Sequence, residues 1–241
     1  MFGGYRGSPI IRGLSFSLNE RSILAIFGKN GSGKTTLLRT ISGILKPLSG
    51  EVLIDGENIF KMDALSRSKK ISYLPQFYES EVPFTVYEMV ELGLYPYRNV
   101  KEDRINSVLN LFDLYKIRNK KFTEISGGQK QKVLLARSLI KDPEVFILDE
   151  PNLHLDFENT LYIFETIVNK VKRENKILIF VLHDLNIILR FCDYLLLMKE
   201  GSNSLFIEKH KIFETPELLK DFIDVDFELL NFKGRNYFFI K

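Results

Sequence analysis

Residues 28–35 read Gly-Lys-Asn-Gly-Ser-Gly-Lys-Thr and fit the pattern G-x-x-x-x-G-K-[ST]. They lie between an apolar run, Ile23–Phe27, and a run with helical character, Thr35–Ser42. Glycines let successive backbone N–H groups point inward at phosphate oxygens, and the following helix offers its positive N-terminal end to the same anion. The segment therefore predicts a nucleoside triphosphate site, and on its own it fits a kinase, a GTPase or a motor equally well.

The residue types in this segment, here called the phosphate cradle, suggest a division of tasks. We expect Lys34 to reach the β- and γ-phosphates and Thr35 to give its hydroxyl to Mg²⁺. The predicted nucleotide contacts cover the cradle and the residue after it: Gly28, Lys29, Asn30, Gly31, Ser32, Gly33, Lys34, Thr35 and Thr36.

Two carboxylates follow a second apolar run, Val145–Leu148. A buried parallel strand delivers its C-terminal residues to the crevice where ligands bind. We expect Asp149 to hold Mg²⁺, directly or through water, and Glu150 to polarise the water that attacks the γ-phosphate. An exposed turn after a core strand would look the same in isolation, but the phosphate cradle favours the catalytic interpretation.

A possible second anion site starts at Ser126, about ninety residues after the cradle, in the run Ser126-Gly127-Gly128-Gln129. Ser126 and Gln129 are spaced as a capping box, which predicts a helix start. A helix start with two glycines also exposes N–H donors to an anion. One triphosphate does not need two cradles on one molecule, so we expect this one to serve ATP held by a neighbouring copy.

The apolar runs indicate an α/β domain. Ile177–Leu182 and Tyr194–Met198 resemble the two runs above in being continuously apolar, which suits strands covered on both faces. Glu51–Ile54, before Asp55-Gly56, is predicted as a strand and turn.

Helical segments lie between several of these runs. Between about Ser80 and Lys141 the spacing of apolar residues predicts helices over Thr85–Gly93, over Arg104–Leu114 and after Ser126, which together form an inserted helical subdomain. The apolar stripe of the helix over Arg104–Leu114 consists of Ile105, Val108, Leu109 and Phe112. The stripe of the helix after Ser126 consists of Val133, Ala136 and Ile140. After Gly201 we expect a short strand, a helix from Thr215 and a hairpin from Phe227 to Ile240.

The amino-acid composition argues against several classes of function. The 241 residues carry 34 Lys plus Arg against 31 Asp plus Glu, a net charge of +3 that does not indicate a nucleic-acid partner. The one cysteine, Cys192, follows an apolar stretch and is predicted to pack as a buried small hydrophobe. The first ten residues lack the pattern of a signal peptide, and the longest apolar runs are too short to span a bilayer.

Ser126–Gln129 resemble the signature motif of ABC ATPases, with Ile125 where that family usually has Leu. The resemblance runs from Tyr5 to about Gly201, with the motifs in family order. It implies a P-loop NTPase (RecA-like) core with a parallel sheet, an antiparallel β part and the inserted helical subdomain. We expect divisions at 1–79 and 142–201 for the nucleotide-binding core, 80–141 for the helical subdomain and 202–241 for a C-terminal extension.

The resemblance also implies residue roles. Tyr5 corresponds to the aromatic residue that stacks on adenine, and Gln76 to the glutamine that touches Mg²⁺ and the attacking water. Leu153-His154-Leu155-Asp156 is similar to the loop that crosses the dimer interface, and His183 to the switch histidine that contacts the γ-phosphate. Outside these motifs, His154 is interpreted as loop structure and His210 suggests no chemistry.

The resemblance implies a head-to-tail dimer that encloses two ATP molecules. The dimer is expected to bind integral-membrane permease subunits from the cytoplasmic side.

This sequence departs from the family pattern in three places. The chain starts only four residues before Tyr5, so we expect either that the first strand is absent or that the true start lies upstream. Lys132 stands where many relatives have Arg, and Leu153 replaces a common small residue.

Two segments, Pro83–Tyr97 and Leu182–Asn186, are similar to those of importers for iron–siderophore complexes, haem and cobalamin. Such systems also use an extracytoplasmic substrate-binding protein. Import of an oxyanion such as molybdate is the alternative within transport. A non-transport ABC ATPase of DNA repair or translation is the alternative outside it, although sustained heptads and a second phosphate cradle are missing from this sequence.

Overall fold

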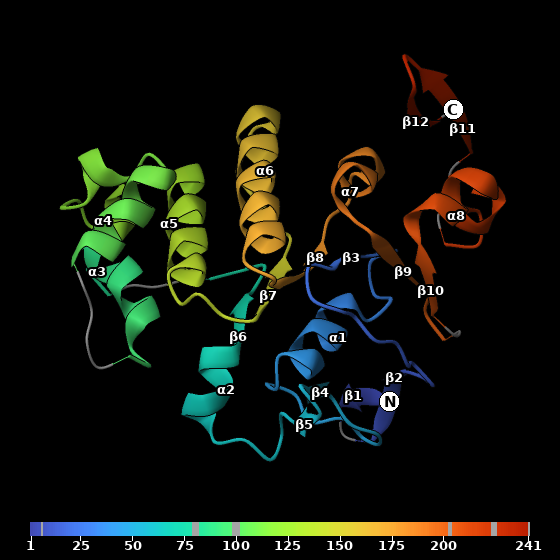
Figure 1. Ribbon diagram of the computed structural model, residues 1–241, viewed down its shortest axis with the longest axis horizontal. Coiled ribbons are helices and arrows are strands. Elements are labelled where there is room, and N and C mark those ends of the chain that lie inside the picture. The colour runs from blue at the N-terminus through green and yellow to red at the C-terminus, as the bar shows by residue number, and fades with distance from the viewer. Residues whose placement is uncertain (6, 79–81, 98–101, 202–203, 223–225, 241) are drawn as a thin grey trace.

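The computed structural model describes residues 1–5, 7–78, 82–97, 102–201, 204–222 and 226–240. Its centre is a six-stranded sheet whose strands run parallel except at one edge, where β10 is antiparallel to β9 (Figure 1). The strand order across the sheet is β10 (Leu205–Glu208), β9 (Tyr194–Met198), β3 (Ile23–Gly28), β8 (Ile177–Val181), β7 (Val145–Asp149) and β6 (Ile71–Leu74).

The sheet is covered on both faces, as the apolar runs predict. Every residue of β3 and β7 is buried. One hydrophobic cluster packs α5 (Gly127–Leu139), α6 (Phe157–Arg173) and α7 (Leu185–Phe191) on one face, and the other packs α1 (Lys34–Ile41) on the opposite face. The four strands predicted from apolar runs are confirmed, with ends that differ by at most one residue from the expected ones.

Cys192 belongs to the core, as predicted. Its side chain is fully buried, and burial raises the pKa of its thiol to about 12. The group therefore stays protonated near neutral pH, and it packs as a small apolar side chain.

Short antiparallel pairs flank α1 at the N-terminal side of the molecule (Figure 1). β1 (Gly3–Tyr5) pairs with β2 (Ser8–Ile11), so Tyr5 ends a strand of three residues. β4 (Leu53–Ile54) pairs with β5 (Glu57–Asn58) across Asp55 and Gly56, whose φ angles of 51° and 76° suit a tight hairpin turn. The predicted strand from Glu51 is therefore present only in its second half. α2 (Ala64–Lys70) then leads into β6.

In the described part of the segment between β6 and β7, three helices and several 3₁₀ turns lie beside the sheet at the left of Figure 1. They are α3 (Val86–Glu91), α4 (Glu102–Leu111) and α5 (Gly127–Leu139), and the turns cover Leu92–Leu94, Tyr115–Ile117 and Phe122–Glu124. Of the predicted stripe on α4, Ile105 and Leu109 are buried and Val108 is half-buried. The helix ends three residues earlier than expected and a 3₁₀ turn follows.

The C-terminal third begins with α6 (Phe157–Arg173), and α7 (Leu185–Phe191) follows β8. After β10 come α8 (Lys209–Glu214) and the terminal hairpin of β11 (Phe227–Phe232) and β12 (Arg235–Ile240), which confirms the expected hairpin. Within the described residues, no helix is long and apolar enough to cross a membrane.

The helix predicted from Thr215 forms only as a short 3₁₀ turn with Thr215 as its N-cap. α8 ends before Thr215, and only a 3₁₀ turn, Pro216–Leu219, follows it. Thr215 has φ −137° and ψ 72°. Proline disfavours the helical conformation in the residue before it, so α8 ends at this point, and Pro216 takes the first position of the 3₁₀ turn.

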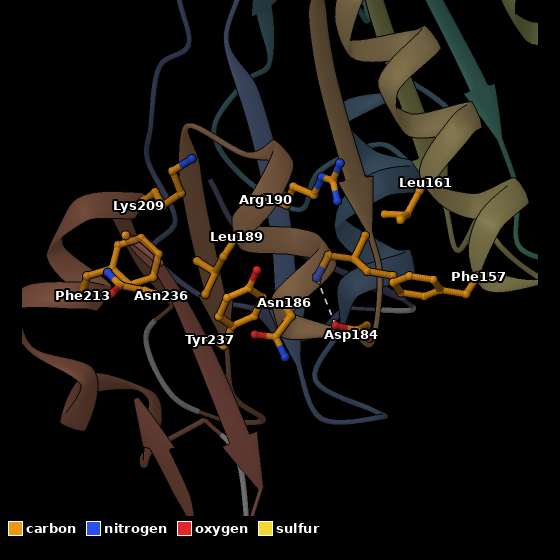
Figure 2. Close-up of a pocket in the computed structure, with 12 residues that line it drawn as sticks. Phe157, Leu161, Asp184, Asn186, Leu189, Arg190, Lys209, Phe213, Asn236 and Tyr237 are labelled. Atoms are coloured by element: carbon orange, nitrogen blue, oxygen red, sulfur yellow. Dashed lines mark hydrogen bonds between the residues drawn. The ribbon is translucent and has the colours of Figure 1, made fainter. Parts of the chain in front are cut away.

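The Asn186 side chain, which is drawn in Figure 2, bonds the hairpin to α7. The Asn186 amide donates to the carbonyl oxygen of Phe238 at 3.0 Å and accepts from its N–H at 2.9 Å. Phe238 is buried against Phe213 and Phe227. A cavity of about 670 Å³ remains between α7, α8 and the hairpin, lined in part by Leu189. The hairpin therefore depends on α7, the helix that starts just after His183.

We expect Asn186→Ala to loosen the hairpin because it leaves both backbone groups of Phe238 without their partner. A lost pair of this kind costs about 1–3 kcal/mol of local stability. Hydrogen exchange of the amides of β11 and β12 measures the effect, and Asn169→Ala on the exposed side of α6 is the control. Equal protection in both variants would show that the amide does not hold the hairpin.

Candidate functional site

The phosphate cradle connects the end of β3 to the start of α1. Gly31 and Gly33 have φ angles of 82° and 95°, which L side chains rarely adopt. A Cβ atom at Gly28 would lie 2.1 Å from the Met198 carbonyl oxygen, so that position also requires glycine. The buried hydroxyl of Ser32 has no hydrogen-bond partner among the described residues. A buried hydroxyl that lacks a partner fits a loop built to contact phosphate oxygens.

Lys34 is buried at the mouth of the cradle. Its ammonium group donates to the carbonyl oxygens of Gly28 at 2.8 Å and Lys29 at 2.9 Å. Burial lowers the pKa of Lys34, while the nearby charges of Glu150 and Asp149 act in the opposite direction. The ammonium group therefore lies between the cradle carbonyls and the acidic end of β7.

Asp149 ends β7 and is almost fully buried. Burial raises the pKa of its carboxyl group, and a hydrogen bond from Thr35 opposes this shift. The hydroxyl of Tyr73 lies 3.4 Å from its Oδ2 atom. The Thr35 hydroxyl and the Asp149 carboxylate are hard oxygen donors, the type that Mg²⁺ prefers, so these residues fit that cation.

Glu150 is held by two predicted site residues. Its Oε2 atom accepts from the Gln76 amide at 2.8 Å, and its Oε1 atom lies 2.8 Å from His183 Nε2. Glu150 also has φ 49°, a conformation that costs a residue other than glycine about 1–3 kcal/mol. The amide nitrogen of Gln76 is engaged by Glu150, so its oxygen stays available as a metal ligand. The four strands β3, β6, β7 and β8 thus deliver their polar residues to one place.

The second helix start is formed as the capping box predicts. The Ser126 hydroxyl accepts from the Gln129 N–H, and the Gln129 amide oxygen accepts from the Ser126 N–H. Ser126 and Gly127 are exposed, and Gly128 is half-buried. These four residues therefore form a helix N-terminus that is open to solvent on α5.

The two glycines of this helix start allow the loop around His154 to pack closely. A Cβ atom at Gly127 would lie 3.2 Å from the His154 ring, and one at Gly128 would lie 3.0 Å from the His154 carbonyl oxygen. Gln131, one turn into α5, donates to the Pro151 carbonyl oxygen at 3.0 Å. Sequence reasoning missed this Gln131 contact, which ties the helix start to the loop after Glu150. His154 has φ 63° and is loop structure, as expected.

Tyr5 lies at the end of β1 with 41% of its surface exposed. Its hydroxyl accepts from Arg39 Nη1 at 3.4 Å, and Arg39 is on the same helix, α1, that begins with Lys34. The ring is therefore accessible to a stacking partner. Tyr73 and Arg39 were not predicted as site residues, and both contact residues that were.

The arrangement suits transfer of a phosphoryl group to water. The cradle and Lys34 provide donors for a phosphate chain, and Glu150 is a carboxylate next to them that can accept a proton from water. Residues 11–153 match the family model of the ABC transporter.

Two curated proteins illustrate the similarity. An uncharacterised ABC transporter ATP-binding protein of Methanocaldococcus jannaschii is 35% identical over 235 residues, which cover 95% of this chain and 91% of the relative. The iron(3+)-hydroxamate import ATP-binding protein of Bacillus subtilis is 31% identical over 236 residues, which cover 94% of this chain and 87% of the relative.

Two solved structures share the fold. One is an inward-facing putative metal-chelate type ABC transporter, with a TM-score of 0.76, 26% identity and coverage of 95% of this chain and 88% of that chain. The other is a dimeric ATP-binding cassette in a post-hydrolysis state with ADP and Pi, with a TM-score of 0.76, 28% identity and coverage of 83% and 91%. The chain belongs to the ABC transporter family and is one of its ATP-binding ATPases.

Proposed function

We propose that this ATPase powers import of a metal chelate through a separate membrane permease. The observation that carries the catalytic part is the triad of Gln76, Glu150 and His183, joined by two contacts of 2.8 Å beside the phosphate cradle. The cargo class is supported by the relatives, one an iron(3+)-hydroxamate import protein and one a metal-chelate type transporter. The ATPase itself does not touch the cargo.

Each site residue has a proposed role. The cradle from Gly28 to Thr36 binds the phosphates, with Lys34 on the β- and γ-phosphates. Thr35, Asp149 and Gln76 hold Mg²⁺, which neutralises phosphate charge when it is bound. Glu150 accepts a proton from the attacking water, and His183 positions Glu150 and contacts the γ-phosphate. Tyr5 stacks on adenine.

The open helix start of α5 supports a dimer. Ser126, Gly127, Gly128 and Gln129 form an anion-binding end that is exposed on this chain. We infer a head-to-tail pair in which these residues of one copy complete the site of the other, so that each γ-phosphate contacts both copies. Hydrolysis removes that shared contact, and the population shifts back to the open pair.

The remaining partners follow from the importer assignment. Permease subunits contact the pair from within the membrane, the pair lies on the cytoplasmic side, and an extracytoplasmic binding protein delivers the chelate. We place the nucleotide-binding core at 1–79 and 142–201, the helical subdomain at 80–141 and the C-terminal extension at 202–241. The junctions at residues 79–80 and at residue 202 fall outside the described residues.

Reconstitution tests the proposal. Purified chain, its permease and the cognate binding protein are placed in proteoliposomes with ATP, and uptake of a ferric hydroxamate is compared with uptake of molybdate. We expect Mg²⁺-ATPase activity that rises with the permease, and uptake of the chelate only. Chelate uptake that does not depend on ATP, or transport of molybdate instead, would contradict the proposed function.

A further inference from the structure

Strand β6 supplies a partner to each of the two carboxylates at the end of β7. The strands are parallel, and Tyr73 is paired in register with Ile147, two residues before Asp149. Side chains two residues apart on a strand share one face. Tyr73 and Asp149 therefore lie on the same face of the sheet, and the Tyr73 hydroxyl is directed at Asp149 Oδ2 from 3.4 Å. Gln76, just past the end of β6, reaches Glu150.

Arg39 is a second polar neighbour of Tyr73. This residue of α1 donates to the Tyr5 hydroxyl at 3.4 Å. Burial raises the pKa of the Tyr73 hydroxyl to about 12, and the Arg39 guanidinium group acts in the opposite direction. A hydroxyl has one proton to donate and lone pairs to accept. A guanidinium group can only donate, so toward Arg39 the Tyr73 oxygen acts as an acceptor, and its single proton remains for Asp149. The contacts thus form one path: Tyr5, Arg39, Tyr73 and Asp149.

We propose that Tyr73 is a positioning residue that orients the Asp149 carboxylate for Mg²⁺, and that Arg39 fixes the Tyr73 hydroxyl in that task. The proposal rests on the metal role proposed for Asp149. A carboxylate oxygen that accepts from Tyr73 is held in one rotamer, and the Thr35 hydroxyl is held beside it. Partners of this kind orient metal ligands, and their loss costs about 10–100-fold in metal affinity or activity.

The variant Tyr73→Phe removes one oxygen and keeps the ring that packs in the core. The matched control is Tyr194→Phe, because Tyr194 is also half-buried and packs against the same hydrophobic cluster. Mn²⁺ serves as the probe, and its free concentration is measured by electron paramagnetic resonance in the presence of ADP. Nucleotide affinity in EDTA is measured in parallel, as is the Mg²⁺ concentration that gives half-maximal ATPase activity.

For Tyr73→Phe we expect Mn²⁺ affinity about 10-fold weaker, the half-maximal Mg²⁺ concentration raised in proportion, and kcat restored by excess Mg²⁺. Nucleotide affinity in EDTA stays unchanged, which a general disturbance of the fold would not allow. Arg39→Lys should lower Mn²⁺ affinity by a smaller factor, and adding it to Tyr73→Phe should lower the affinity no further, because both changes act on one contact.

Three results would overturn the proposal: equal Mn²⁺ affinity in Tyr73→Phe and wild type, an equal effect of Tyr194→Phe, or weaker nucleotide binding in EDTA. If the wild-type protein instead binds nucleotide equally well with and without Mn²⁺, the metal role proposed for Asp149 is wrong. The failure of the inference and the failure of the proposed function are therefore distinguishable.

Discussion

Glu150→Gln is expected to lower ATP turnover by about 10²–10⁴-fold, the usual contribution of a positioned general base. Glutamine has nearly the same shape as glutamate, but its amide cannot accept the proton of the attacking water. The variant keeps the cradle and Lys34, so it binds ATP and Mg²⁺ as the wild type does. Because hydrolysis no longer removes the γ-phosphate, ATP should hold the two copies together.

Sedimentation velocity measures this association. We compare Glu150→Gln and wild type, each with and without ATP and Mg²⁺, and use Glu158→Gln on the exposed first turn of α6 as the control. The dimer fraction should rise only for Glu150→Gln with ATP and Mg²⁺. If that sample stays as loosely associated as nucleotide-free wild type, the dimer mechanism is wrong.

The sequence was sufficient to predict the sheet because buried parallel strands are continuously apolar. Once Val145–Leu148 and Ile177–Leu182 are recognised as such strands, the residues after them must lie at one edge of the sheet. That reasoning places Asp149, Glu150 and His183 near one another, and the structure has the 2.8 Å contact between Glu150 and His183. Local patterns also predicted the capping box of α5, which needs only residues within one turn.

The contacts that were missed depend on register and on distant segments. Tyr73 reads as an ordinary strand residue, and only the pairing of β6 with β7 shows that it faces Asp149. The bonds between Asn186 and Phe238 join residues 52 positions apart, and no spacing rule connects them. Near Thr215 the proline that follows marks both the end of α8 and the start of a 3₁₀ turn, and the prediction of a helix from Thr215 missed α8.

Ser126→Arg is expected to abolish ATP hydrolysis while the affinity of the single chain for nucleotide stays the same. Ser126 is exposed, and among the described residues its side chain bonds only within the start of α5, so a longer side chain fits on the isolated chain. In the head-to-tail pair the same side chain would occupy the space of the partner's γ-phosphate. Losing this contribution from charge-stabilising donors should cost at least about 10²-fold in kcat. Nucleotide affinity is measured by titration at a protein concentration below that of dimer formation.

Mixing two inactive variants decides whether Ser126 acts on the partner's ATP. Lys34→Ala disables the cradle of its own chain, and Ser126→Arg disables the opposite site. A mixed pair has one intact site, which combines Lys34 of the Ser126→Arg chain with Ser126 of the Lys34→Ala chain. Activity should therefore return on mixing. It should not return when Ser126→Arg is mixed with a chain that carries both substitutions, because every site in that mixture lacks Lys34 or Ser126. If the first mixture is as inactive as the second, or if Ser126→Arg alone weakens nucleotide binding to the single chain, then Ser126 does not complete its partner's site.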